Sequence, residues 1–296
     1  MSDNNTRKFN RGRYMAFLTV ITVCCVILGS LAHLAGALFW RFGFKPAGMG
    51  QGVVGGSDTL AGYAGLDLDM DIGSLKVVKG SEFMIEFENY PQGMEPTWEM
   101  KGDTLVVNQK SGMNWGKNAD FNHKGGVKLT IPEGSTPDMD IHLAMGGLEI
   151  SDLAFGSMVI DLDMGACTLT DCSMSGCSID ADMGACTLTN CTMADCNIDA
   201  DMGDIDFAKC TFTDGTFAAD MGAITLKDCN FATADCDADM GSIEVSGTFR
   251  GLNADCAMGS VKVTTDAGCE NADMDLKTDM GKVTVNGTSY GNEYRK

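Results

Sequence analysis

The residues of this chain that could do chemistry are aspartates that recur every 19 residues in its second half. One set holds Asp163, Asp182, Asp201, Asp220 and Asp239. A second set, two residues earlier in the repeat, holds Asp161, Asp180, Asp199 and Asp237. Carboxylates together with backbone oxygens are the ligands that Ca²⁺ prefers. The first set therefore predicts a weak Ca²⁺ site. The alternative is a solvated acidic face that keeps the sheet from pairing with others.

Cysteine is the second chemical feature, with 13 residues in the chain. A ladder at the same period contains Cys172, Cys191, Cys210 and Cys229. Stacked positions have parallel Cα–Cβ vectors, which strain a disulfide. Cys167, Cys172 and Cys177 are each separated by four residues, unlike zinc motifs. We therefore favour buried free thiols, with some disulfides or a metal site as alternatives. Free thiols in an exported protein would indicate a reducing habitat.

No catalytic constellation is visible in the sequence. The histidines are His33, His123 and His142, and none belongs to a Ser/His/Asp, Walker or zinc motif. The acids form uniform columns, without a basic or aromatic cleft around a special carboxylate pair of the kind that cleaves glycosides. We predict a non-enzymatic protein that has no cofactor apart from the Ca²⁺ considered above.

The period itself predicts the elements that position these residues. A fixed repeat near 20 residues is typical of one supersecondary unit per repeat, stacked on its neighbours. In one repeat, residues 179–183 alternate apolar and acidic side chains, and Gly184 permits a corner. Residues 186–188 form a second strand, and Asn190 tolerates a second corner. Residues 191–196 would form a third side. The fold class is therefore all-β, a β-solenoid with rungs of about 19 residues.

Stacking in register, with rungs about 4.8 Å apart, predicts ladders of identical positions inside the solenoid. One ladder would be Met164, Met183, Met202, Met221 and Met240. A second would be Cys167, Cys186, Ile205, Ile224 and Ile243. A third would be Leu169, Leu188, Phe207, Leu226 and Val245. Cysteine shares its ladder with isoleucine, so it behaves there as a small hydrophobic residue.

The repeats, residues 141–288, follow a β-rich N-terminal part at 63–140 and precede a polar tail at 289–296. Short alternating runs between turn residues predict an antiparallel β region in that N-terminal part. The runs are residues 75–78, 83–87, 104–107 and 127–132.

An apolar run at residues 15–40 has no acidic or basic side chain apart from His33. It is long enough to cross a bilayer, which needs about 20 apolar residues. Basic residues crowd residues 1–14, which predicts a cytoplasmic tail, one transmembrane helix and an extracellular C-terminal domain. A Gly-rich linker at 41–62 would join helix and domain. The alternative is a cleaved signal peptide, for which residues 35–37 (Ala-Gly-Ala) could be the cleavage site.

The charge balance bears on partners. The net charge is −20, and an acidic body repels nucleic acid. The expected partners are the membrane, through the N-terminal helix, and a cell-wall, glycan or protein ligand outside the cell.

Several segments resemble the bacterial putative-adhesin domains, a family of unknown function. They are residues 71–77 (DIGSLKV), 127–134 (VKLTIPEG), 240–245 (MGSIEV) and 280–285 (MGKVTV). The resemblance covers about residues 65–288, and it implies a β-solenoid on a membrane-anchored protein, without defining binding residues. We therefore predict a surface adhesin or envelope-interaction module. The alternative is an envelope-stress or signalling accessory protein with a sensing ectodomain.

Overall fold

The computed structural model describes residues 53–110 and 125–296. The chain divides into two units, 1–50 and 51–296, and the second contains the whole described fold. The predicted cytoplasmic tail, the transmembrane helix and residues 41–52 of the predicted linker lie outside the described residues. The rest of the predicted linker is not only a linker, because Val53–Thr59 form a strand that pairs with Met84–Pro91. Among the residues that are described, no helix is long and apolar enough to span a bilayer.

Strands are the only regular secondary structure of the described residues, and they join in one sheet of 21 strands. The first strands are β1 (Val53–Thr59), β2 (Gly65–Met70), β3 (Ser74–Gly80), β4 (Met84–Pro91), β5 (Thr97–Lys101), β6 (Thr104–Gln109) and β7 (Gly126–Pro132). The strands of the repeats are β8 (Asp138–Met145), β9 (Leu148–Ser151), β10 (Ala154–Met164), β11 (Cys167–Thr170), β12 (Ser173–Met183), β13 (Cys186–Thr189), β14 (Thr192–Met202), β15 (Ile205–Ala208), β16 (Thr211–Met221) and β17 (Ile224–Thr265). The last strands are β18 (Asp273–Met280), β19 (Val283–Val285), β20 (Thr288–Ser289) and β21 (Glu293–Arg295).

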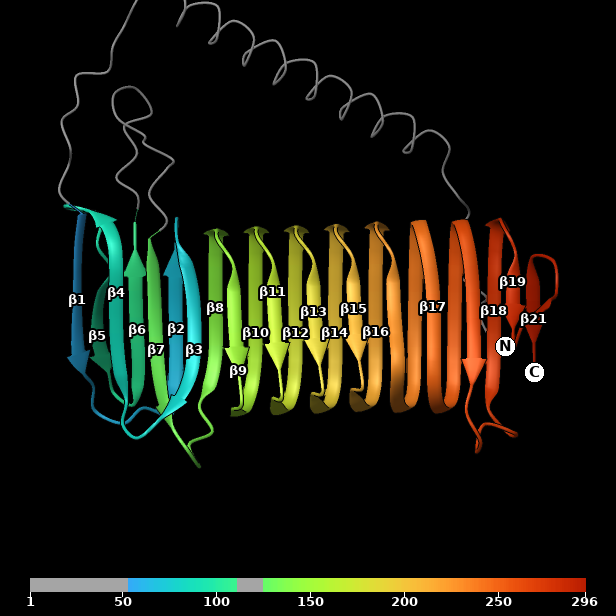
Figure 1. The fold of residues 1–296 in the computed structure, drawn as a ribbon, viewed down its shortest axis with the longest axis horizontal. Helices are drawn as coiled ribbons and strands as arrows, with labels where there is room; N and C mark the ends of the chain where they lie inside the picture. The colour runs from blue at the N-terminus through green and yellow to red at the C-terminus, as the bar shows by residue number, and fades with distance from the viewer. Residues whose placement is uncertain (1–52, 111–124) are drawn as a thin grey trace, which may run out of the picture. The chain divides into compact units, whose positions relative to one another are not determined.

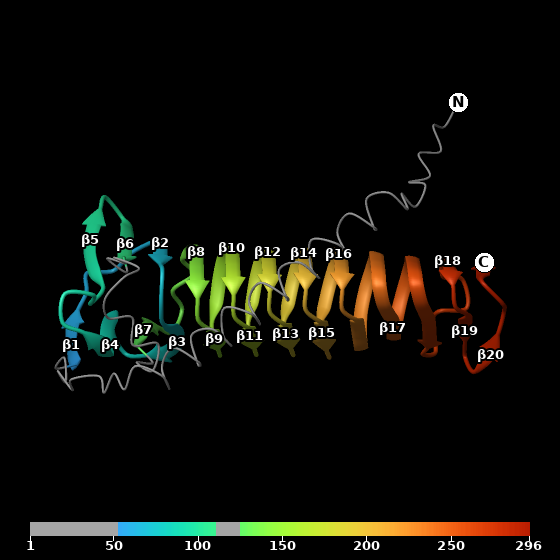
Figure 2. The ribbon, with the colours of Figure 1, turned by 90° about the horizontal axis from the view of Figure 1, so that it is seen from above.

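Each repeat makes one coil of a β-solenoid, as predicted (Figure 1). A long strand of 11 residues, such as β12, is followed by a short strand of four residues, such as β13. Long strands pair in parallel with long strands of adjacent coils, and short with short, so that identical positions stack. The long and short strands lie on opposite sides of the stack (Figure 2).

The predicted corners are present, but the predicted third side is not a separate strand. Gly184 separates β12 from β13, and Asn190, with a φ of 55°, separates β13 from β14. The chain then runs through residues 192–202 as one strand. Its ladder to the preceding coil passes from Met193 to Asp195 without pairing the residue between them. The predicted third side is thus the first part of the long strand, and only this unpaired residue separates it from the rest of the strand.

The methionine ladder predicted to lie inside is on the surface, which corrects the sequence prediction. Met164, Met183 and Met202 expose 41%, 42% and 38% of their area. Met221 and Met240 are half-buried. The ladder between long strands also skips the aspartate before each methionine. The inside–outside alternation fails there, because the strand turns into the glycine corner.

The other two inward ladders are confirmed. Their members, from Cys167 to Ile243 and from Leu169 to Val245, are buried with at most 1% of their area exposed. Buried cysteines join the aliphatic core from Cys167 onward, and buried phenylalanines cluster between Phe207 and Phe249. Phe212 lies parallel to Phe231, with ring centroids 4.8 Å apart, and Phe231 stacks on Phe249 at 5.0 Å. Such pairs add to the stabilisation that area burial gives.

The N-terminal part is mixed rather than antiparallel throughout. β2 and β3 pair in parallel with β8 and β9, so they already form a coil of the stack. β4 pairs antiparallel with β1 and β7, and β5 pairs antiparallel with β6. The four strands predicted from sequence correspond to β3, β4, β6 and β7. At the other end, β20 and β21 pair antiparallel with β19 and β18, which covers backbone groups of the last coil.

Candidate cation-binding face

The long strands bring the predicted aspartates onto one outer face. In the parallel register, Asp161 pairs with Asp180, and Asp180 pairs with Asp199. All three are exposed, whereas the neighbouring Ile179 and Ala181 point into the core. We call this set, with Asp237, the inner Asp column.

The outer Asp column comprises Asp163, Asp182, Asp201, Asp220 and Asp239, the residues predicted to bind Ca²⁺. They lie at the ends of the long strands, next to the glycine corner. Asp163 is half-buried and the other four are exposed. The two columns together form a grid of carboxylates, which we call the acidic face.

Like charges on this face perturb one another. Partial burial raises the pKa of Asp180, and the charges of Asp199 and Asp161 raise it further. Burial and then Asp182 and Asp199 raise the pKa of Asp201. The pKa of Asp220 is raised by burial and then by Asp239 and Asp201. A cation between coils would relieve this repulsion, and carboxylates so placed offer the hard oxygen ligands that Ca²⁺ takes.

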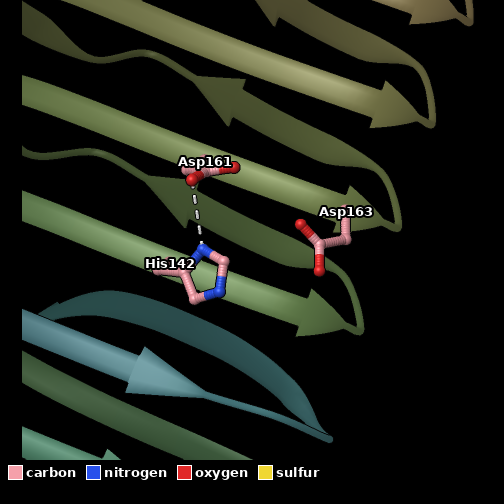
Figure 3. Close-up of side chains that lie close together, drawn as sticks. All are labelled: His142, Asp161 and Asp163. Atoms are coloured by element: carbon pink, nitrogen blue, oxygen red, sulfur yellow. Dashed lines mark ion pairs between the residues drawn. The ribbon is translucent and has the colours of Figure 1, made fainter.

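One end of the inner column holds a different donor set, formed by His142, Asp161 and Asp163 (Figure 3). His142 lies on β8, and its register partners are Asp161 on β10 and Asp69 on β2. Its Nδ1 lies 3.2 Å from an Asp161 carboxylate oxygen. One donor atom from each of the three residues lies within 4.8 Å of the others. An imidazole with two carboxylates suits borderline divalent ions such as Zn²⁺ better than carboxylates alone do.

Sequence reasoning missed this cluster because it looked for histidines in local motifs. The signal was the repeat itself, since His142 stands 19 residues before Asp161. In a parallel solenoid that spacing places the two side chains on adjacent rungs.

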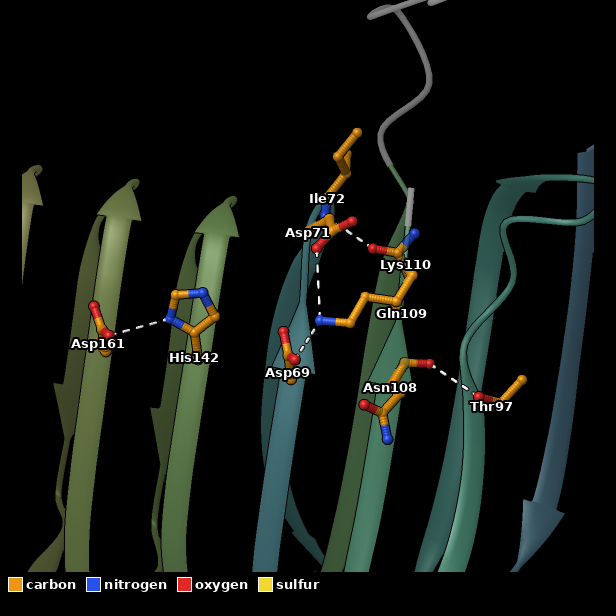
Figure 4. A network of polar contacts seen from close by, with 9 residues as sticks. All are labelled: Asp69, Asp71, Ile72, Thr97, Asn108, Gln109, Lys110, His142 and Asp161. Atoms are coloured by element: carbon orange, nitrogen blue, oxygen red, sulfur yellow. Dashed lines mark hydrogen bonds and ion pairs between the residues drawn. The ribbon is translucent and has the colours of Figure 1, made fainter. Parts of the chain in front are cut away.

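Beyond His142, a lysine meets the same column (Figure 4). The Lys110 ammonium donates to Asp69 and lies 3.8 Å from Asp71, and the contact with Asp69 raises the pKa of Lys110. The adjacent Gln109 is buried, and its side chain accepts a hydrogen bond from the Ile72 amide at 2.8 Å. Positive or neutral groups thus face the column at its N-terminal end. Carboxylate follows carboxylate from Asp161 to Asp199, and Ala218 then interrupts the column before Asp237.

The cysteines lie away from this face, inside the coils. Every described cysteine is a buried free thiol. Burial raises the pKa of Cys186 to about 12, and that of Cys256 to about 11. These two thiols are therefore protonated at neutral pH and are poor nucleophiles or metal ligands. The Cys191 thiol donates to the Leu169 carbonyl of the preceding coil at 3.6 Å.

A family model, Toastrack DUF4097, matches residues 85–293. The chain belongs to the Toastrack DUF4097 family. Comparison with curated proteins found no match.

Solved structures share the Toastrack fold at low sequence identity. One is described as a putative adhesin from Parabacteroides distasonis, with 14% identity, a TM-score of 0.55, and coverage of 80% of this chain and 97% of that one. A second is described as a putative lipid binding protein from the same species, with 14% identity, a TM-score of 0.54 and the same coverage. A putative adhesin from Parabacteroides merdae has 11% identity, a TM-score of 0.55 and again the same coverage. These likenesses establish the fold of the Toastrack chain.

Proposed function

We propose that this protein is a non-enzymatic surface protein, anchored in the cell membrane by residues 15–40, that presents its solenoid outside the cell as an adhesin or envelope-interaction module. The observation that carries the proposal is the acidic face. It repeats the same exposed groups on consecutive rigid coils, which suits binding to a repetitive partner better than it suits chemistry at one point.

Two further features support this assignment. The fold is shared with structures described as putative adhesins, which favours a binding role. Among the described residues, the one compact cluster of His, Cys, Asp or Glu donors, at His142, lies on the open outer face. Active sites usually lie in a concave pocket instead.

We further propose that Ca²⁺ binds weakly between carboxylates of the outer Asp column and bridges them to the ligand. Wall polymers and glycans offer hydroxyl and anionic oxygens, which complete the six to eight oxygen ligands that Ca²⁺ takes. Ca²⁺ would also reduce the repulsion within the column, so it would raise the melting temperature of the protein.

The test is binding of the purified full-length chain to isolated cell wall and to host-type glycans, with Ca²⁺ and with chelator. Saturable binding that chelator abolishes is the expected result. The variant Asp182→Asn/Asp201→Asn/Asp220→Asn should weaken it. A matched control removes three acids that pair with lysines elsewhere, Glu133→Gln/Glu149→Gln/Glu244→Gln.

The control separates a specific face from net charge, because both variants remove three carboxylates. Equal loss in the two variants would show that net charge alone attracts the ligand. No binding under any condition would contradict the adhesin proposal and favour the accessory protein with a sensing ectodomain.

A further inference from the structure

A column of eight methionines, four exposed and four half-buried, runs along the glycine corner, and core packing does not account for it. We call Met145, Met164, Met183, Met202, Met221, Met240, Met258 and Met280 the Met column. From Met145 to Met240, each member pairs in register with the next. The exposed fraction reaches 61% at Met280. Methionine is usually a buried residue.

Other methionines of the same coils behave as core residues. Met174 and Met193 also pair in register, but they point inward and expose 6% and 3% of their area. The coil therefore has a place for methionine in its core, and the Met column is an additional, outward set. It places one methionine per coil at the glycine corner, and Met164, Met183 and Met202 are exposed there on consecutive coils.

The spacing of the column matches the needs of a soft monovalent cation. Adjacent strands lie about 4.8 Å apart. Zinc–thiolate bonds are about 2.3 Å long, and an ion held in a line between two sulfurs at a similar distance would span about 4.6 Å. Thioethers are soft ligands and select Cu(I) over the hard cations that prefer oxygen. The flexible methionine side chain can take up the small remaining mismatch.

The charge around the column favours cations as well. Each of Met164, Met183 and Met202 directly follows a member of the outer Asp column. Asp182 and Met183 are both exposed at the same corner, so carboxylates line the side of the thioethers. A surface of one sign raises the local concentration of the opposite ion. The carboxylates attract cations of any kind, and the sulfurs select the soft ones.

We propose that the Met column is a binding strip for soft monovalent cations, Cu(I) and its analogue Ag(I), each held by thioethers of adjacent coils. The exposed Met164, Met183 and Met202 provide two successive pairs, so binding is not limited to one ion per chain. This activity is separate from adhesion, since it uses sulfur rather than the carboxylates that would bind Ca²⁺.

The test is titration of the full-length protein with Ag(I), observed through the ¹³C-labelled methyl groups of methionine by NMR. The resonances of Met164, Met183 and Met202 should shift, and those of Met174 and Met193 should not. The variant Met164→Leu/Met183→Leu/Met202→Leu keeps apolar volume and removes sulfur. It should bind Ag(I) about tenfold more weakly or worse, since even indirect changes around a metal cost 10- to 100-fold in affinity.

The matched control is Met174→Leu/Met193→Leu, which removes two buried thioethers and should leave Ag(I) affinity unchanged. Shifts of the buried methyl groups without shifts of the exposed ones would overturn the proposal, because they would place the ion among the buried thiols. Unchanged affinity in the exposed variant would also overturn it. If that variant failed to fold, the wild-type spectra alone would decide. Excess Ca²⁺ should not displace Ag(I), and displacement would show that carboxylates bind it.

Discussion

The two corners of each coil reverse the chain in different ways. At the glycine corner the backbones of successive coils approach closely, and a Cβ on Gly184 would lie 1.5 Å from the Gly165 carbonyl oxygen. At the opposite corner, Asp171, Asn190 and Lys209 have φ values of 54°, 55° and 57°. The first corner excludes a side chain because the next coil occupies its space. The second only requires a left-handed backbone, which several residue types adopt at some cost.

The two faces that these corners separate differ in a similar way. On the long-strand face, carboxylates stack on carboxylates in the central coils. On the short-strand face, opposite charges meet between coils, as in Lys76 with Glu149 and Lys262 with Glu244. The shape of the chain is therefore most constrained at the glycine corner, and its charge is most uniform on the long-strand face. The opposite corner and the short-strand face accept more residue types.

The largest effect that would test this comparison is a side chain at the glycine corner. Gly184→Ala should destabilise the protein by about 3 kcal/mol or more, since even overpacking that can relax costs 1–3 kcal/mol and here both atoms are fixed to backbone. The measurement is the free energy of unfolding in urea. Gly176→Ala is the matched control, because a Cβ there meets nothing within 4 Å. It should be neutral or slightly stabilising.

A small effect of Gly184→Ala would contradict the close approach of coils. It would mean that adjacent coils can separate at this corner, so that both corners would accept a side chain. The same result would weaken the argument for the Met column, whose regular spacing depends on tightly stacked rungs.

The two corners can be predicted from the sequence, whereas the outward direction of the Met column cannot. The corners could be located because Gly184 and Asn190 are the residues that break alternation or tolerate a positive φ. The Met column was misplaced because strict alternation was extended to the end of the strand. Asp182 and Met183 are consecutive and both exposed. A bend at a strand end depends on the next coil, which a single repeat does not reveal.

The candidate site could likewise be predicted in part: the Asp columns follow from the sequence, and the contact of His142 with Asp161 does not. The period aligned the two Asp columns, and the structure places them on one face. His142 also obeys the period, since it lies 19 residues before Asp161. The strand register of the structure is needed to show that the two side chains are in contact. The parallel pairing of β2 with β8 could not be read from the sequence, since their separation, residues 65–70 against 138–145, lies outside the repeat.

A smaller effect is expected at the opposite corner. Lys209→Gly should stabilise the protein by about 0.5–1 kcal/mol, the relief of left-handed strain less the added entropy of the unfolded chain. Asn190→Gly is the paired variant and should gain less. Asparagine tolerates this conformation, and its side-chain amide donates to the Asp171 carboxylate. Urea unfolding of both variants gives the comparison, and equal gains would show that residue type is irrelevant at this corner.

The smallest effects distinguish the charges of the two faces. Asp180→Asn should stabilise at pH 7 and Glu149→Gln should destabilise, each by about 0.5 kcal/mol or less, because exposed charges are screened. The pKa of Asp180 is raised by burial and by its neighbours. Its contribution to stability is therefore fully present below the ordinary aspartate pKa and is lost as the pH rises through the raised value.

Melting temperatures from pH 4 to pH 7 test this sign. The advantage of Asp180→Asn over the wild type should be present at pH 7 and should shrink as the pH falls into the acidic range. Added salt should reduce it as well. An advantage that stayed constant with pH and salt would mean that Asp180 destabilises the strand through its shape or hydrogen bonding rather than its charge. The contrast between the faces would then not be electrostatic.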